Sequence, residues 1–162
     1  MSIKASIYIY TLIVLIFVSY LDLKYRKISN LWPILNIVSF LLLAVFFPKL
    51  EFFSYRSFFL PMIIIFIGVV LFKYKIMGGG DSKFLASMIL LVHHEVQLSF
   101  IYILAWTTAG FATFRILYLL FKNREINRSN FIVLIPRTLS GKKFPYAPII
   151  LLSWIIFGWE IY

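Results

Sequence analysis

The stretch SFIYILAWTTAGFATFRILYLLF, residues 99–121, decides the fold class of this chain. Arg115 is the only charged residue in it. A helix needs about 20 mostly apolar residues to cross the hydrocarbon core of a bilayer. The stretch therefore predicts a transmembrane helix.

Five further apolar runs flank this stretch along the chain. The 162 residues are 62% hydrophobic and 20% aromatic, which is more apolar surface than a soluble domain of this size could bury. The sequence therefore predicts an all-α, polytopic membrane protein, with residues 1–162 forming a single domain of six transmembrane helices. The expected spans are 7–21, 31–47, 58–72, 84–92, 99–121 and 147–159.

The basic residues orient these spans. The net charge is +10, and the basic residues lie in the short loops between the apolar runs. With the N-terminus and the C-terminus outside, twelve basic residues fall in cytoplasmic loops and three fall outside, as the positive-inside rule requires. Membrane topology explains the charge, so we expect the lipid bilayer and no nucleic acid as a partner.

Three segments carry expectations of their own. The run at 84–92 is about half a span, so the fourth helix should begin near Asp81 and cross incompletely, or continue to about Glu95. The apolar residues 131–135 should lie on the membrane surface or pack beneath the bundle. Small residues along the fifth span predict a helix-packing seam, formed by Ala105, Ala109, Gly110 and Thr113.

Two of the six acidic residues stand apart from the others. Asp22 and Asp81 both fall at cytoplasmic ends of expected spans, so they share one membrane side and one depth. A carboxylate at the end of a span is costly, and either aspartate alone could form an interfacial ion pair with a nearby lysine. Two of them on one side, one after a glycine run, favour a pair of carboxyls that act together.

The glycine run Gly78-Gly79-Gly80 precedes Asp81 at the start of the short span. Glycine adopts positive φ without strain and lets the backbone approach another group closely. The run lacks the Gly-Lys-Ser/Thr ending of a phosphate-binding loop, and no βαβ pattern surrounds it. We therefore expect a close-packed turn that sets the Asp81 carboxylate against a partner carboxylate.

These residues resemble a known family of membrane proteases. Gly78, Gly80 and Asp81 match the Gly-x-Gly-Asp motif of intramembrane aspartyl proteases. The continuation to Lys83 is similar to the type IV prepilin peptidases and preflagellin peptidases, with Phe84 where that family usually has leucine.

Two further elements extend the resemblance over most of the chain. Asp22, Ile28 and Asn30 resemble the family's first motif, with Ser29 in place of the usual proline. Near the end of the chain, the segment from Pro145 through Tyr146 and Ala147 to Pro148 resembles the element that opens the family's last span.

The resemblance implies a function. The chain would be a membrane aspartyl endopeptidase that removes the short basic leader of prepilin, pseudopilin or archaellin-type precursors, in type IV pilus assembly or secretion. It would lie in the cell (inner) membrane with its active site facing the cytoplasm. Larger members carry a cysteine-containing region and N-methylate the new pilin end. This chain resembles the short, peptidase-only branch, for which we expect no methyltransferase activity and no cofactor.

In such an enzyme Asp22 and Asp81 would be catalytic. The residues expected to shape the site are Gly78, Gly79, Gly80, Lys83, Ile28, Asn30, Pro145 and Pro148. Two carboxyls hydrolyse a peptide when one is protonated and the other ionised, because like charges held close cannot both ionise cheaply. The sequence leaves open which aspartate takes which part. Lys83 lies two residues from Asp81 and points to a different helix face, so we expect it to serve topology or anchoring.

Other functions stay open beside this one. A non-enzymatic subunit of a secretion or pilus assembly system, or a small transporter component, would use both aspartates as structural ion pairs or as a proton relay. A presenilin-like protease is disfavoured because the last span lacks the Pro-Ala-Leu element. We expect no metal: cysteine is absent, and His93, His94 and Glu95 form an ordinary polar loop on the outer side.

Overall fold

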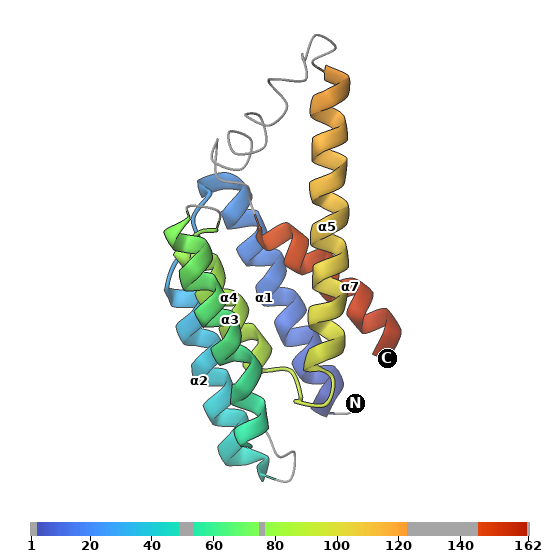
Figure 1. Cartoon of the computed structure of the whole chain (residues 1–162). Helices are drawn as coiled ribbons and strands as arrows, with labels where there is room; N and C mark the ends of the chain where they lie inside the picture. Colours follow the sequence, from blue (N-terminus) through green and yellow to red (C-terminus); the bar gives the residue numbers. More distant parts are fainter. Residues whose placement is uncertain (1–2, 49–53, 75–76, 123–145, 162) are drawn as a thin grey trace.

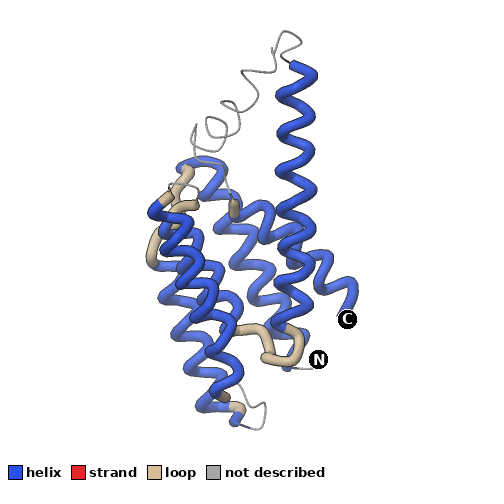
Figure 2. The backbone as a smooth tube through the Cα atoms, in the orientation of Figure 1, coloured by secondary structure: helices blue, strands red, loops and turns tan. Residues whose placement is uncertain are grey.

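The structure, a computed structural model, describes residues 3–48, 54–74, 77–122 and 146–161 of the chain. These residues form six helices and no strand (Figures 1 and 2). Each of the six apolar runs that the sequence predicted as a span lies wholly or mostly within a helix, which confirms the all-α prediction for the described residues. The helices are α1 (Ile3–Tyr25), α2 (Leu31–Phe46), α3 (Tyr55–Lys73), α4 (Gly79–Leu90), α5 (Gln97–Lys122) and α7 (Ala147–Ile161).

The short helix α4 lies inside the bundle. It packs against α3 and α2, while α7 packs against α1 and α5 (Figure 1). The side chain of Ser82 and those of all residues from Phe84 to Ile89 are buried. A helix that is buried on nearly every side is surrounded by protein rather than by solvent or lipid. Asp81 therefore stands at the start of the most enclosed helix.

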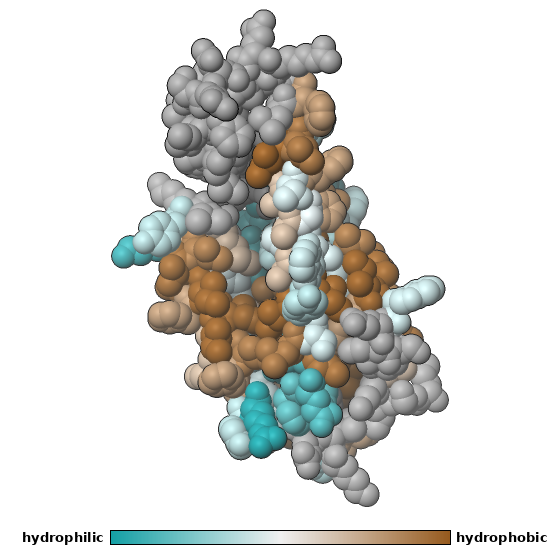
Figure 3. Space-filling view, turned by 45° about the vertical axis from the view of Figure 1, so that its right-hand side comes forward, coloured by the Kyte–Doolittle hydropathy of each residue, from teal (hydrophilic) through white to brown (hydrophobic). Residues whose placement is uncertain are grey.

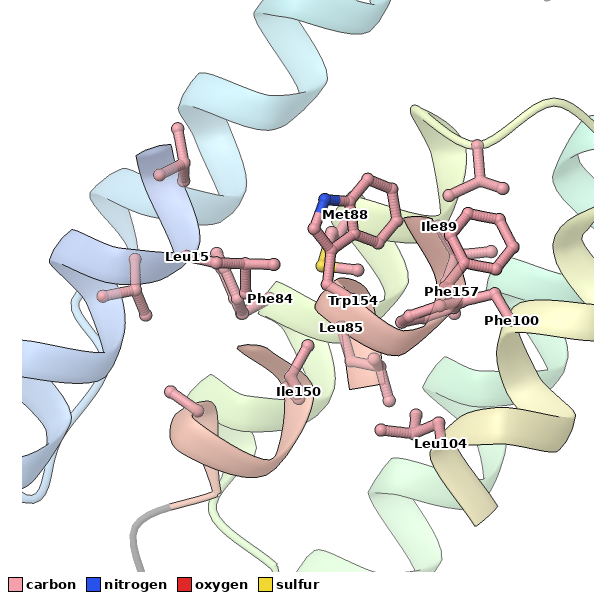
Figure 4. Packing of buried hydrophobic residues seen from close by; sticks show 14 of the residues in the cluster. Leu15, Phe84, Leu85, Met88, Ile89, Phe100, Leu104, Ile150, Trp154 and Phe157 are labelled. Atoms are coloured by element: carbon pink, nitrogen blue, oxygen red, sulfur yellow. The ribbon is translucent and has the colours of Figure 1, made fainter. Parts of the chain in front are cut away.

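The main core joins the two groups of helices. Phe84 and Met88 of α4 belong to one buried cluster with Leu15 of α1, Phe100 of α5 and Trp154 of α7 (Figure 4). Rings meet edge to face there, with the centroids of Phe100 and Trp154 5.4 Å apart. Such aromatic contacts add to the area that is removed from solvent. The cluster fixes α4 against the helices that carry the other site residues.

The bounds of α4 agree with its predicted shortness. It starts at Gly79 and stops at Leu90, so its 12 residues span about 18 Å, against about 30 Å for a hydrocarbon core. The helix begins near Asp81, as the sequence predicted, and it does not continue to Glu95. Residues 91–96 form a turn before α5.

A buried amide closes the C-terminal end of α4. Gln97, fully buried, donates from Nε2 to the carbonyl oxygens of Ile89 at 3.1 Å and Val92 at 3.0 Å. The same nitrogen lies 3.3 Å from the carbonyl oxygen of Ser57 in α3. Carbonyls at a helix end have no partner within the helix, and leaving them unpaired in a buried place is costly. Gln97 therefore lets α4 stop inside the protein.

Helix α7 crosses α1 through aromatic and glycine contacts. The rings of Tyr8 and Trp154 stack at 5.5 Å, and Trp154 Nε1 donates to the Tyr8 carbonyl oxygen at 3.3 Å. A Cβ at Gly158 would collide with the Tyr8 ring, so the close approach requires glycine. Tyr8 lies near the start of α1 and Gly158 near the end of α7, so both described ends of the chain lie at one end of the bundle.

The outer surface is largely apolar. Large hydrophobic side chains of α2, α3 and α5 are exposed, among them Leu42, Phe66 and Phe114, and Figure 3 shows apolar surface over much of one face. Three helices of the described residues, α1, α3 and α5, are long and apolar enough to cross a membrane, and α2 and α7 are shorter apolar helices. These properties are those of a membrane protein.

The predicted packing seam on α5 is wrong. Its four small residues are exposed, and a Cβ at Gly110 would meet nothing within 4 Å. Contact with α7 is made instead through Thr107, whose Oγ1 lies 2.6 Å from Ser153 Oγ. Small residues permit close helix packing without requiring it. The predicted surface segment, residues 131–135, lies outside the described residues.

Candidate active site

Asp22 is buried in the last turn of α1, with 3% of its surface exposed. Its Oδ2 accepts a hydrogen bond from the backbone N–H of Ala147 at 3.1 Å, and the N–H of Tyr146 also bonds to the carboxylate. The C-terminal end of a helix disfavours negative charge, whereas the N-terminal end favours it. The N–H groups at the start of α7 thus offset the cost of placing the negative charge of Asp22 at the C-terminal end of α1.

The turn after Asp22 redirects the chain toward α4. Arg26 has φ of 51°, in the left-handed region, and its N–H donates to the Asp22 carbonyl oxygen at 2.8 Å. This bond closes the end of α1 in the way usual for a left-handed residue just past a helix. The chain then carries Ile28, which is buried, into the main core.

Asp81 occupies the first turn of α4 and is half-buried. Its Oδ2 accepts the backbone N–H of Gly78 at 3.2 Å, while its own N–H donates to the Gly78 carbonyl oxygen at 3.1 Å. A carboxylate in the first turn pairs an orphan N–H and meets the positive end of the helix dipole. The backbone therefore fixes where the Asp81 side chain stands.

The glycine run brings α4 against the loop after α1. A Cβ at Gly80 would lie 2.9 Å from the carbonyl oxygen of Ile28, which is too close, whereas a Cβ at Gly79 would make an ordinary 3.5 Å contact with Phe72. The expected close approach is confirmed for Gly80. The expected positive φ is wrong, since no described glycine has one. Glycine is therefore needed in this run for the close approach of α4 to the Ile28 carbonyl oxygen, and not for an unusual backbone conformation.

Tyr146 links the Asp22 carboxylate to α5. Its hydroxyl oxygen is 3.2 Å from Thr108 Oγ1 of α5, and its own N–H binds Asp22. Burial raises the pKa of the Tyr146 phenol, the hydrogen bond with Thr108 lowers it, and the charge of Asp81 raises it further. The residue thus touches one aspartate and lies within the electric field of the other.

The remaining expected site residues lie around this centre. Asn30 precedes α2 and is exposed, as is Lys83 on α4, and Pro148 is half-buried in the first turn of α7. Pro145 lies outside the described residues.

The candidate metal ligands lie at the opposite end of α4. His93 Nδ1 is 3.5 Å from Glu95 Oε2 there, and the rings of His93 and His94 are 4.4 Å apart. Within the described residues no group of three His, Cys, Asp or Glu side chains could hold a metal ion.

Sequence reasoning missed three contributors, namely Tyr146, Ala147 and Thr108. The segment before α7 was noticed as a motif, but only its prolines were given a role. A backbone N–H that meets a carboxylate from 125 residues earlier leaves no local pattern. Thr108 could have been suspected only as a polar residue in the middle of an apolar span.

The arrangement offers two carboxyls at one end of the bundle, each bonded to backbone N–H groups. Such a pair can exchange protons with a reacting group, as general acid–base chemistry requires.

Comparison with known proteins gives one match. The family model described as the type IV leader peptidase family matches residues 9–114, a range that includes Asp22, the glycine run and Asp81. A search of curated proteins and a search of solved structures found no match.

Proposed function

Because the chain belongs to the type IV leader peptidase family, we propose that it is an aspartyl endopeptidase in which Asp22 and Asp81 form the catalytic pair. The observation that carries this proposal is the close approach between the start of α4, which bears Asp81, and the loop that follows Asp22, where a Cβ at Gly80 would lie 2.9 Å from the Ile28 carbonyl oxygen. Backbone N–H groups, those of Gly78 and Ala147, bind a carboxylate oxygen of Asp81 and of Asp22 respectively.

The reaction uses one protonated and one ionised carboxyl. The ionised carboxylate takes a proton from a water molecule while the water oxygen adds to the scissile carbonyl carbon. The protonated carboxyl gives its proton to the carbonyl oxygen. As the C–N bond breaks, a proton passes to the leaving nitrogen, which leaves a new carboxyl end and a new amine.

The substrate that fits this site is a prepilin, pseudopilin or archaellin-type precursor. Its apolar helix would lie in the bilayer beside the apolar outer helices, and its basic leader junction would reach the end of the bundle that carries the aspartates. We propose that the chain is one six-span domain of the cell (inner) membrane, with this end facing the cytoplasm. The shared position of both described chain ends supports an even number of crossings.

The test is the processing of a precursor in membranes or proteoliposomes that contain the protein. The precursor needs a basic leader, a glycine and an apolar helix. Asp22→Asn and Asp81→Asn each remove the ionisable group with little change in size, so each should abolish cleavage while the protein remains folded. The double variant should be no worse, since residues that act as a unit are not additive.

Glu95→Gln is the matched control, because it neutralises an exposed carboxyl at the far end of α4 and should leave cleavage intact. Normal processing by stably folded Asp22→Asn or Asp81→Asn protein would reject the peptidase and leave the non-enzymatic subunit as the explanation.

A further inference from the structure

Gly68 lies on the face of α3 that points into the protein. It is buried, whereas its neighbours Ile67 and Val69 are exposed. The other buried residues of α3, Ser57 and Pro61, stand on the same helix face, two or three turns earlier. Helix α3 packs against α4, and the two run side by side in Figure 1. Gly68 is therefore part of the surface through which α3 meets α4.

At Gly68 the two helix backbones approach too closely for a side chain. A Cβ at Gly68 would overlap the Cβ of Ser82 in α4, and it would lie 2.5 Å from Ser82 Oγ and 3.6 Å from Ser82 Cα. A hydroxyl can rotate away, but a Cβ is fixed to its backbone. Two carbon atoms need about 3.5 Å between them. Gly68→Ala must therefore move the start of α4, the backbone of α3, or both.

Ser82 passes such a movement directly to the candidate site. Asp81 precedes it in the first turn of α4, and the Cα atoms of consecutive residues are about 3.8 Å apart. The Asp81 side chain is bound to the same turn, because its Oδ2 accepts the N–H of Gly78 at 3.2 Å. The Asp81 carboxyl therefore moves with the backbone of this turn.

Gly80 limits movement on the other side of the same turn. Gly80 and Ser82 are two residues apart, so they point about 200° apart around the helix. A Cβ at Gly80 would lie 2.9 Å from the Ile28 carbonyl oxygen, so α4 has no room to retreat toward the loop after α1. The first turn of α4 is thus held between α3 and this loop, with Asp81 between the two contact residues.

We propose that Gly68 is a positioning residue: its contact with Ser82, opposed by the contact of Gly80 with the loop after α1, sets where the Asp81 carboxyl stands relative to Asp22. This inference rests on the proposed peptidase function. Gly68 belongs to none of the sequence motifs that carry the family resemblance, and it acts on the site through Ser82.

The experiment moves a Cβ from α4 to α3. It compares the kinetics of precursor cleavage in proteoliposomes for wild type, Gly68→Ala, Ser82→Gly and the double variant, at equal amounts of folded protein. Gly68→Ala should lower kcat about tenfold and leave KM little changed, because the displaced carboxyl serves the transition state. The fall should be smaller than for a full displacement, since the outer side of α3 is exposed and this helix can yield in part.

Ser82→Gly alone should cleave at close to the wild-type rate. The double variant should recover most of the kcat that Gly68→Ala loses, because the Cβ that causes the overlap is gone. Gly110→Ala is the matched control in α5, where a Cβ would meet no described atom within 4 Å, and it should leave kcat unchanged.

A wild-type kcat per folded molecule for Gly68→Ala, even with a lower Tm, would overturn the inference and leave Gly68 as a packing residue. A double variant that cleaves no better than Gly68→Ala would also overturn it, because the loss would not come from the contact with Ser82. If Gly68→Ala does not fold, Ser82→Thr decides, since it enlarges the side chain on the α4 side of the same contact. A lower kcat at unchanged KM then supports the inference, and a wild-type kcat overturns it.

These outcomes are separate from the test of the peptidase itself. A negative result for Gly68 keeps the proposed function, provided that Asp22→Asn and Asp81→Asn abolish cleavage. If these two variants still cleave, the proposed function fails first.

Discussion

At its N-terminal end α4 is closed by Asp81, which accepts the N–H of Gly78, whereas at its C-terminal end Gln97 donates to the carbonyls of Ile89 and Val92. Both side chains pair backbone groups that a helix end leaves unsatisfied. They differ in chemistry and in exposure. Gln97 is neutral and fully buried, and Asp81 is ionisable and half-buried.

The difference separates a structural cap from a candidate catalytic group. A neutral amide is sufficient to end a helix inside the protein, so capping alone does not require a carboxyl at the other end. A carboxyl in an enclosed place costs more than an amide, and such groups usually serve a function. Changes at the two ends should therefore have different consequences.

The largest expected effect is on catalysis and comes from Gly80→Ala. The new methyl group would meet the Ile28 carbonyl oxygen at 2.9 Å, and this contact involves backbone that cannot rotate away. Displacing the loop after α1 moves Asp22 relative to Asp81, and an error of about 1 Å can reduce catalysis about a hundredfold.

Gly79→Ala is the matched control, since its methyl group has room beside Phe72 and alanine favours the helix. We expect near-normal cleavage. Equal cleavage rates for the two alanine variants, measured at equal amounts of folded protein, would contradict the close contact between α4 and the loop.

The second effect is on stability and comes from Gln97→Leu. This change leaves the buried carbonyls of Ile89 and Val92 without their donor, which should lower the free energy of unfolding by about 2 kcal/mol. Thermal unfolding in detergent micelles measures it. Leu98→Ala, at the exposed neighbouring position, should change stability little. Cleavage per folded molecule should remain close to wild type. A loss of cleavage as large as that of Gly80→Ala would show that the N-terminal and C-terminal ends of α4 do not act independently.

The smallest effect concerns the turn that leads to the site. Arg26→Gly relieves the left-handed conformation at φ 51° and should raise the free energy of unfolding by up to about 1 kcal/mol. Lys24→Gly removes the same charge two residues earlier, inside α1, and should lower it by about 1 kcal/mol. Chemical unfolding of the two variants side by side measures the difference. A similar loss for both would argue against strain at Arg26.

The sequence predicted the elements better than the contacts between them. The six helical segments, the shortness of α4 and the position of Asp81 at its start followed from apolar runs and a glycine run, which are local patterns. The prediction for Gly80 was only half right. A close contact and a positive φ both favour glycine, and the sequence alone cannot tell which of the two applies.

Gln97 and Tyr146 were missed for a different reason. Each acts on residues of another helix or of a distant segment, and the sequence gives no register between helices. The seam expected on α5 failed in the same way, since the small residues were present but the partner helix crosses elsewhere. Where a carboxyl, an amide or a hydroxyl finds its partner is decided by tertiary packing.

The enclosure of α4 has a consequence for how the protein responds to its membrane. Lipid chains contact the outer helices, and those helices tilt when the bilayer thickness changes. Because the side chains of α4 from Phe84 to Ile89 are buried against protein, hydrophobic mismatch has little surface on which to act there. The depth of Asp81 is set by α2, α3 and the core rather than by acyl-chain length. The 12-residue helix thus holds the Asp81 carboxyl at a fixed height among its neighbours, and membranes of different thickness should leave the geometry of the aspartate pair unchanged.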